Sequence, residues 1–495
     1  MNTRLIKETR DLLPIFAGSP LLIAVPYLIF HISDAGLGYA ILGLACAVMG
    51  GSSFGNEFQH RTLSLLLSQP IARSVIWREK MLVLGAGMLS SLAALLVCLA
   101  VRRPAIDGQD WLALVLIPLC AFCGAPFWTL SLRQGIAGIV AAVAIPCSIL
   151  AVIALITQQL GGDLTDALCA ACVMLLLIYC PLVYWLGYAK FKRLEAVDGP
   201  RRELGLPAGL EAFFVRPLTR IGARFHSPFA TLLKKEFRLQ QIGFLLAGLS
   251  VLFAVVAACL IKHYPDLGGG IVAADCAIYV IILPLIAGAT SVAEEKGWGI
   301  AEWHLTLPPS ALTQWSAKML ATLSTSLVLG LLLPVATFLV GQELFGPPGH
   351  RAAFPPVFEL LCWPLGSLLL TSIAVYAASI SNSTLRAILG AVGIIIGAYC
   401  VGGLTVIEAG NVVRNLGLAI IHTTPWQELT PLLMAGGLSL MLCEVQWFAW
   451  SNFRRQGLNA RMTVVQIVVL LLSVGLITLG FIAFLFGLSS PYLIR

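Results

Sequence analysis

The sequence predicts an all-α polytopic membrane protein, built from two tandem six-helix units and one extra C-terminal helix. The 495 residues are 59% hydrophobic and only 11% charged, whereas a soluble domain carries about 25% charged residues. Apolar stretches of roughly 20 residues, the length that crosses a bilayer, recur along the whole chain. A set of five residues also recurs in the second half at unchanged spacing. Glu57, Pro70, Trp77, Lys80 and Met81 return as Glu295, Pro308, Trp315, Lys318 and Met319.

The first unit is predicted to occupy residues 1–194. Three basic residues precede its first apolar stretch, which is too long for a cleaved signal peptide and is expected to stay as a membrane span. The six expected spans cover about 12–32, 37–54, 81–101, 111–131, 135–156 and 168–188.

A hydrophilic linker at 195–230 is predicted to join the two units. It is rich in Lys, Arg, Gly and Pro and is too short to bury the core of an independent enzyme domain. The second unit is expected at 231–456 and opens with a Lys-Glu pair, as the first unit does. Its spans cover about 241–261, 271–291, 319–340, 357–378, 385–407 and 429–450, and the extra helix falls within 457–495.

Basic residues predict the orientation of these spans. Most of the 31 Lys and Arg residues fall in the segments that lie on the N-terminal side of the membrane in this layout. The positive-inside rule therefore places the N-terminus in the cytosol. It also places there the two polar segments that follow the second span of each unit. We call residues 57–81 the first elbow and residues 295–319 the second elbow.

The first elbow is predicted to begin as an amphipathic helix at the membrane surface. Its polar residues follow a helical spacing along one stripe, with leucines beside them. These polar residues are Glu57, His60, Arg61, Ser64 and Ser68. Pro70 then ends the helix or fixes the next turn. A segment that merely joins two spans is the alternative, but its recurrence in the second unit favours a functional surface.

The sequence offers little for catalysis or cofactor binding. It lacks a phosphate-cradling GxxxxGK motif, an HExxH zinc motif and a GxSxG nucleophile elbow, so we expect neither an enzyme nor a cofactor. The cysteine pairs 120/123 and 169/172 have CxxC spacing, but no His or carboxylate accompanies them, and packing explains them better than a metal. Glu444 and Asp275 lie in apolar stretches and are candidates for a transport path.

At the first elbow the sequence resembles the cytoplasmic segment of type-2, exporter-like permeases of ABC transporters. In that family a Glu is followed by an Arg-Thr or Gly-Thr pair, then Leu-Leu-Ser-x-Pro, and a Lys opens the third span. The matching residues here are Glu57, Arg61, Thr62, Leu66 and Pro70. In the second elbow only Glu295, Leu305 and Pro308 match, and the Arg-Thr pair is missing.

This resemblance implies a partner. In that family a dimer of separate cytosolic ATPase subunits docks on the elbows, and ATP binding re-orients the spans. The eight residues would then take part in coupling rather than in catalysis. From 55 to 80 the first elbow carries a net positive charge, and from 293 to 318 the second carries a net negative charge, which predicts unequal coupling by the two units.

Two other functions stay open at this point. A secondary transporter can also pair two six-span halves, and a membrane scaffold need not transport anything. A bacterial plasma membrane is the expected location, the lipid bilayer is the expected surrounding, and nucleic acid is not an expected partner. The uniformly apolar spans do not identify a substrate.

Overall fold

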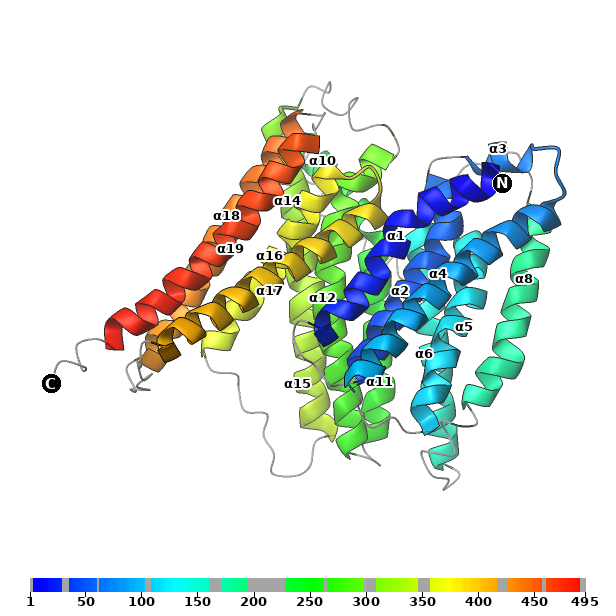
Figure 1. The fold of residues 1–495 in the computed structure, drawn as a ribbon, viewed down its shortest axis with the longest axis horizontal. Helices are drawn as coiled ribbons and strands as arrows, with labels where there is room; N and C mark the ends of the chain where they lie inside the picture. The colour runs from blue at the N-terminus through cyan, green and yellow to red at the C-terminus, as the bar shows by residue number, and fades with distance from the viewer. Residues whose placement is uncertain are drawn as a thin grey trace. The chain divides into compact units, whose positions relative to one another are not determined.

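In the computed structural model, every regular element of the described residues is a helix. The structure describes residues 3–28, 35–59, 62–102, 108–159, 169, 171–194, 228–261, 265–297, 299, 309–345, 357–415, 426–455 and 460–489. The chain divides into two compact units, residues 1–204 and 205–495, and Figure 1 traces the helices of each.

Long apolar helices build the first unit. Its elements are α1 (Thr3–Leu28), α2 (Ala35–Gln59), α3 (Leu63–Leu67), α4 (Arg73–Arg102), α5 (Gly108–Leu132), α6 (Gly135–Gln159), the π-helical turn η1 (Leu175–Tyr179) and α8 (Cys180–Arg193). The short helix α3 belongs to the first elbow and lies between α2 and α4.

Long apolar helices also build the second unit. Its elements are α10 (Pro228–Leu239), α11 (Gln241–Ile261), α12 (Pro265–Gly297), α14 (Ala311–Leu327), the π-helical turn η2 (Val328–Leu332), α15 (Leu333–Phe345), α16 (Val357–Ile380), α17 (Thr384–Asn415), α18 (Trp426–Arg455) and α19 (Ala460–Ser489).

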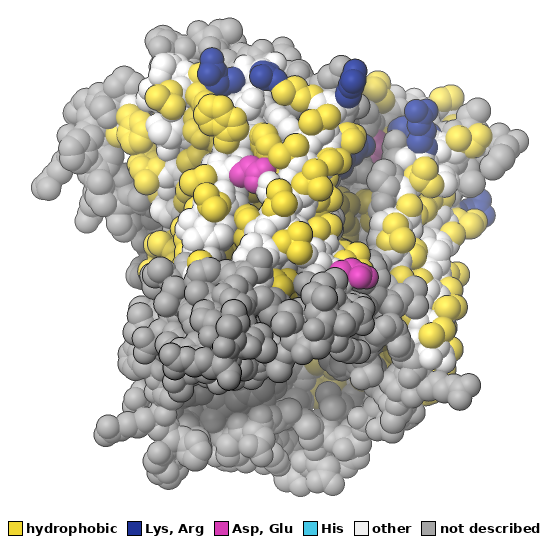
Figure 2. Space-filling view, turned by 60° about the vertical axis from the view of Figure 1, so that its left-hand side comes forward, with side chains coloured by type: hydrophobic (Ala, Val, Ile, Leu, Met, Phe, Trp, Pro, Cys, Tyr) yellow, Lys and Arg dark blue, Asp and Glu magenta, His cyan; other side chains and the backbone are white. Residues whose placement is uncertain are grey.

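Eight helices of the described residues are long and apolar enough to cross a membrane. Together with the all-helical fold, they confirm the predicted all-α polytopic membrane protein. Figure 2 shows one face with many exposed hydrophobic side chains and with Lys and Arg gathered toward one edge. On α18 and α19 such exposed residues include Leu440, Trp447, Leu472 and Leu476, as expected of helices that face lipid.

The second span of each unit is its packing centre. Helix α2 contacts α1, α4, α5 and α6, and α12 contacts α11, α14, α16 and α17. A glycine at the same repeat position allows a close helix approach in each unit. A Cβ atom added at Gly50 would lie 2.5 Å from Ala125 Cβ, and one added at Gly288 would lie 2.4 Å from the backbone oxygen of Thr371. Small residues at such points let membrane helices pack without side chains between them.

The first elbow differs from the single amphipathic helix that the spacing predicted. Helix α2 continues through Glu57 to Gln59, and a separate five-residue helix, α3, begins at Leu63. The polar stripe is therefore split between two helices. The backbone N–H of Thr62 donates to the carbonyl of Glu57 over 3.0 Å, a wider turn than an α-helix makes. His60 and Arg61 lie outside the described residues.

The extra C-terminal helix is part of the second unit. Helix α19 packs against α17 and α18, and α18 and α19 run side by side in Figure 1. A buried amide pair fastens it: Gln466 Nε2 donates to Asn452 Oδ1 over 2.9 Å, and Asn452 Nδ2 donates to Gln466 Oε1 over 3.0 Å. The Tyr376 hydroxyl donates to the same Gln466 oxygen over 3.2 Å.

Candidate functional site

A buried lysine joins three helices at the first elbow. Lys80, near the start of α4, is 2% exposed. Its Nζ donates to Glu8 Oε2 of α1 over 2.7 Å and to the backbone oxygen of Ser53 in α2 over 3.0 Å. It also donates to Glu57 Oε1 of α2 over 3.4 Å. The exposed Lys7 lies 3.5 Å from the same Glu57 oxygen. We call these four charged residues the first ion cluster.

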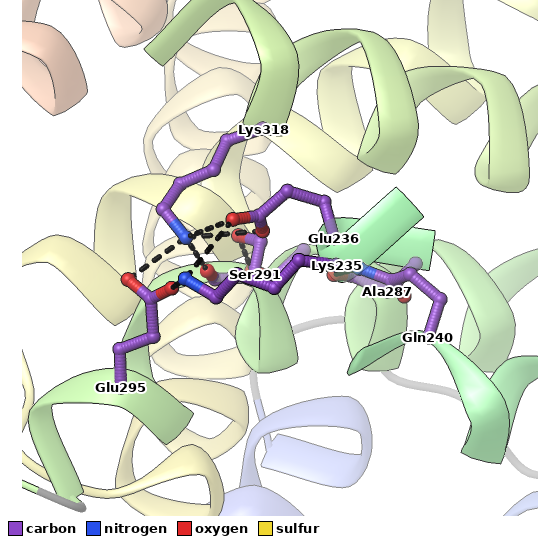
Figure 3. A network of polar contacts seen from close by, with 8 residues as sticks. Lys235, Glu236, Gln240, Ala287, Ser291, Glu295 and Lys318 are labelled. Carbon is purple, nitrogen blue, oxygen red and sulfur yellow. Dashed lines mark hydrogen bonds and ion pairs between the residues drawn. The ribbon is translucent and has the colours of Figure 1, made fainter. Parts of the chain in front are cut away.

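The second unit contains an equivalent ion cluster, drawn in Figure 3. Lys318 Nζ of α14 lies 3.0 Å from both carboxylate oxygens of Glu236 in α10. It lies 2.8 Å from Glu295 Oε2 of α12 and donates to the backbone oxygen of Ser291 over 3.0 Å. Lys235 donates to the other Glu295 oxygen. Lys235, Glu236, Glu295 and Lys318 form the second ion cluster.

Charge balance explains why these groups are tolerated in the interior. Burying an unpaired ion costs roughly several kcal/mol of desolvation free energy. An opposite charge and hydrogen bonds to the ion offset this cost. Each ion cluster holds two lysines and two glutamates, so each has no net charge. The backbone oxygens of Ser53 and Ser291 complete the hydrogen bonding of the buried ammonium groups.

The Glu57 carboxylate also anchors the first elbow itself. The Thr62 hydroxyl donates to Glu57 Oε2, which fixes the approach to α3. Leu63, Leu66 and Leu67 turn inward and are buried. Leu65 is 67% exposed. The segment after α3 is also exposed, at Ser68, Gln69 and Pro70. The elbow thus has an inner side held by packing and an outer side open to contact.

Aromatic side chains support the start of the third span in both units. The Trp77 ring lies 5.5 Å from Phe54 and 5.6 Å from Phe191, measured between centroids. The Trp315 ring lies 5.2 Å from Phe453 and 5.7 Å from Trp450. In the first unit these rings pack α4 against α2 and α8, and in the second unit they pack α14 against α18, beside the ion clusters.

The carboxyl groups that flank the elbows are held in their charged form. Burial opposes ionisation of Glu57, but Lys80, the Thr62 hydrogen bond and Lys7 outweigh it and lower its pKa. Burial likewise opposes ionisation of Glu295, and Lys318 and Lys235 lower its pKa. Glu236 is different, because burial and the nearby Glu295 charge outweigh Lys318 and raise its pKa.

The predicted coupling residues thus occupy different layers of the site. Glu57, Leu66 and Glu295 are buried, and Pro70 is exposed. Arg61, Leu305 and Pro308 lie outside the described residues. The predicted roles in coupling stay predictions. Sequence reasoning missed Glu8 and Glu236, although the Lys-Glu pair that opens each unit marked both.

The two residues proposed for a transport path have different outcomes. Glu444 in α18 is partly buried and accepts a hydrogen bond of 3.0 Å from the Ser473 hydroxyl of α19. Gln446, two residues further along α18, donates to Ser372 of α16 over 2.7 Å. Asp275 belongs to α12, but its side chain lies outside the described residues.

The cysteines of the described segments are free thiols. Cys120 Sγ lies 3.7 Å from Cys180 Sγ in the packed core between α5 and α8. In the part of the chain that the structure describes, no group of three or more His, Cys, Asp and Glu residues could hold a metal ion.

Comparisons with known proteins add no relative: this chain matches no protein-family model, no curated protein and no solved structure.

Proposed function

We propose that this chain is the membrane-spanning permease subunit of an ATP-binding cassette transporter, driven by a separate cytosolic ATPase and acting as an exporter. The observation that carries the proposal is the recurrence of one joint. In both units a buried lysine of the third span ties the helix before the elbow to the N-terminal helix of the unit. A segment that only connects two spans has no need for such a joint.

The outer side of the first elbow supports a docking role. Leu65 and the exposed residues from Ser68 to Pro70 form a small mixed surface on a short helix that is firmly held from within. Rigid presentation favours binding, because little side-chain or backbone freedom is lost when a partner docks. In this proposal the surface faces the cytosol, the chain lies in a bacterial plasma membrane and its N-terminus is inside, an orientation that the positive-inside rule favours.

The buried members of the elbow act indirectly in this proposal. Glu57, Thr62 and Leu66 hold α3 in place, and Glu295 does the same for the second elbow. The surface residues Leu65 and Pro70 would meet the ATPase.

Purification of the tagged chain in mild detergent tests this function. We expect a soluble ATPase with a phosphate-binding Gly-rich loop to accompany it, and Leu65→Asp to release that ATPase. Ile6→Asp is the matched control, since it places the same charge on an exposed aliphatic position of α1 and should retain the partner. A monodisperse wild-type chain without any ATPase would contradict the proposal.

A secondary transporter is the second candidate, and Glu444 favours it. An ionisable group at membrane depth is costly, and its presence there marks a candidate for function. Glu444 also accepts a hydrogen bond from Ser473, which links α18 to α19. Transport that depends on an ion gradient and is lost in Glu444→Gln, without any ATPase, would favour this candidate over the first.

A further inference from the structure

We propose that Lys80 and Lys318 are positioning residues that make the N-terminal helix of each unit move with its elbow as one body. The idea rests on the proposed function for its role in transport, but the joint itself is a property of the chain. It assigns to α1 and α10 the task of carrying elbow motion into the membrane.

The first ion cluster encloses the elbow from both sides. Glu57 lies at the end of α2 before α3, and Lys80 lies on α4 after it, so both flanks of the elbow meet at one ammonium group. Glu8 brings α1 to the same point. Moving the elbow away from α1 would therefore part a buried charge from its 2.7 Å partner, which leaves an unpaired ion in the interior.

Contacts deeper in the first unit continue this connection along the span. The Ser19 hydroxyl of α1 lies 2.8 Å from the Ser91 hydroxyl of α4. Phe16 of α1 fits against Gly87, where an added Cβ atom would lie 2.2 Å from the ring. Helix α1 continues from Thr3 to Leu28, and its first internal proline, Pro14, follows Glu8 by six residues. A displacement at Glu8 is therefore carried directly by the first turns of α1, and the Ser19–Ser91 contact ties the helix to α4 beyond Pro14.

The second unit has the same joint on a divided helix. Helix α10 ends at Leu239 and α11 begins at Gln241. The buried Gln240 between them donates to the carbonyl of Ala287 over 3.0 Å and accepts from Thr290 over 3.3 Å. The second elbow can thus carry α10 with it while Gln240 stays attached to α12. The joint is thus attached to one continuous helix in the first unit and to a helix interrupted at Gln240 in the second.

Spin labels placed across the first joint test the proposal. Ile6 on α1 and Leu65 on α3 are both exposed and can carry labels, while Lys80→Met removes the joint between them. The labelled chain is measured without the ATPase, because a label at Leu65 would occupy the proposed docking surface. In the wild-type chain we expect a narrow Ile6–Leu65 distance distribution, and in Lys80→Met a distribution at least twofold broader. An unchanged width in Lys80→Met overturns the proposal.

A control pair shows that the variant is folded. Labels at Leu21 and Leu89, both exposed on α1 and α4, report on the deeper Ser19–Ser91 contact and should give equal widths in both chains. If Lys80→Met does not fold, Glu8→Ala removes only the α1 partner of Lys80, and the same broadening is expected.

Two further measurements, ATPase retention and transport by Lys80→Met, distinguish a failure of the proposed joint from a failure of the proposed function. Lys80→Met leaves the outer side of α3 intact, so it should retain the ATPase but lose at least tenfold in transport. If no ATPase accompanies the wild-type chain, the permease function fails, yet the Ile6–Leu65 widths in the isolated chain still decide the joint. Retained transport together with unchanged widths would mean that the ion cluster only stabilises the fold.

Discussion

The two units share an ion cluster but differ in the helix that each cluster holds. In the first unit α1 is one helix of 26 residues, and Leu12, four residues after Glu8, is buried. In the second unit the residue four positions after Glu236 is Gln240, and the helix is interrupted there. An apolar residue lets the helix continue through the core, whereas the amide bonds to α12 and accompanies a break. The ion cluster is thus the same in both units, but the N-terminal helix attached to it is continuous in the first unit and interrupted in the second.

The units also differ on their outer face. Helix α19 covers part of α17 and α18 through the Gln466–Asn452 pair. When Tyr188 and Phe191 are aligned with Trp450 and Phe453, Lys190 takes the position of Asn452. The Lys190 ammonium lies 5.9 Å from the Phe127 ring centroid. The second unit has therefore gained a polar attachment that the first unit does not contain in its described residues.

The largest effect is expected from removing the buried lysines. Lys80→Met and Lys318→Met each leave two carboxylates without their central cation, and breaking such a buried pair costs about 3–5 kcal/mol. Lys318→Met should cost more, because both of its carboxylates lie within 3.0 Å, whereas Glu57 lies 3.4 Å from Lys80. Thermal unfolding in detergent measures both. A smaller loss for Lys318→Met would show that the second ion cluster is the weaker one.

Close helix packing provides the next comparison. Gly288→Ala places a methyl group 2.4 Å from a backbone oxygen and 2.6 Å from Ala374 Cβ. Such overpacking costs about 2 kcal/mol. Gly50→Ala should cost less, since the nearest backbone oxygen lies 3.2 Å away. Gly248→Ala is the control, because nothing lies within 4 Å of its added Cβ. Equal melting temperatures for Gly288→Ala and Gly248→Ala would contradict the tight approach of α12 to α16.

A smaller effect is expected at the attachment of α19. Gln466→Leu removes the partner of the buried Asn452 Oδ1 and the acceptor of the Tyr376 hydroxyl, while Asn452 Nδ2 keeps its bond to Ser379. We expect a cost of about 1.5 kcal/mol. The rate of proteolysis after residue 455, or the yield of cross-links between α18 and α19, measures whether α19 separates from α18. Val464→Leu, at an exposed position on the same helix, should leave the attachment unchanged. If Gln466→Leu behaves like this control, apolar packing alone holds α19.

The pH dependence of stability should give the smallest effect, with opposite signs for Glu57 and Glu236. The lowered pKa of Glu57 stabilises the fold above the unfolded pKa, and this contribution is lost as the pH falls through the folded pKa. The raised pKa of Glu236 has the opposite effect: protonation favours the folded state, and this contribution is lost as the pH rises through the unfolded and then the folded pKa.

Melting curves of Glu57→Gln and Glu236→Gln between pH 7 and 4 would show these signs. Glu57→Gln should reduce the loss of stability in acid, and Glu236→Gln should increase it. Parallel shifts in both variants would mean that the two clusters titrate alike.

Much of the fold was predictable because hydropathy acts locally. A bilayer forces every backbone polar group into a helix, so apolar stretches of sufficient length identified the helices, including α19. The elbow was harder. The helical spacing of Glu57, Arg61 and Ser68 predicted one helix, but the Thr62–Glu57 hydrogen bonds form a turn there. That turn depends on a carboxylate already held by Lys80 from another helix.

The sequence by itself determined the membrane class, the order of the helices and the repeat of a glutamate before a lysine, since these depend on composition and spacing. Only the tertiary structure decided what the repeat is for. Glu57 and Glu295 were expected to belong to a polar cytosolic surface, but both are buried beside a lysine that a distant glutamate also binds. Linear spacing does not encode the meeting of Glu8 with Lys80 or of Glu236 with Lys318. Packing of three helices brings these charges together, and their burial then makes the pairing necessary.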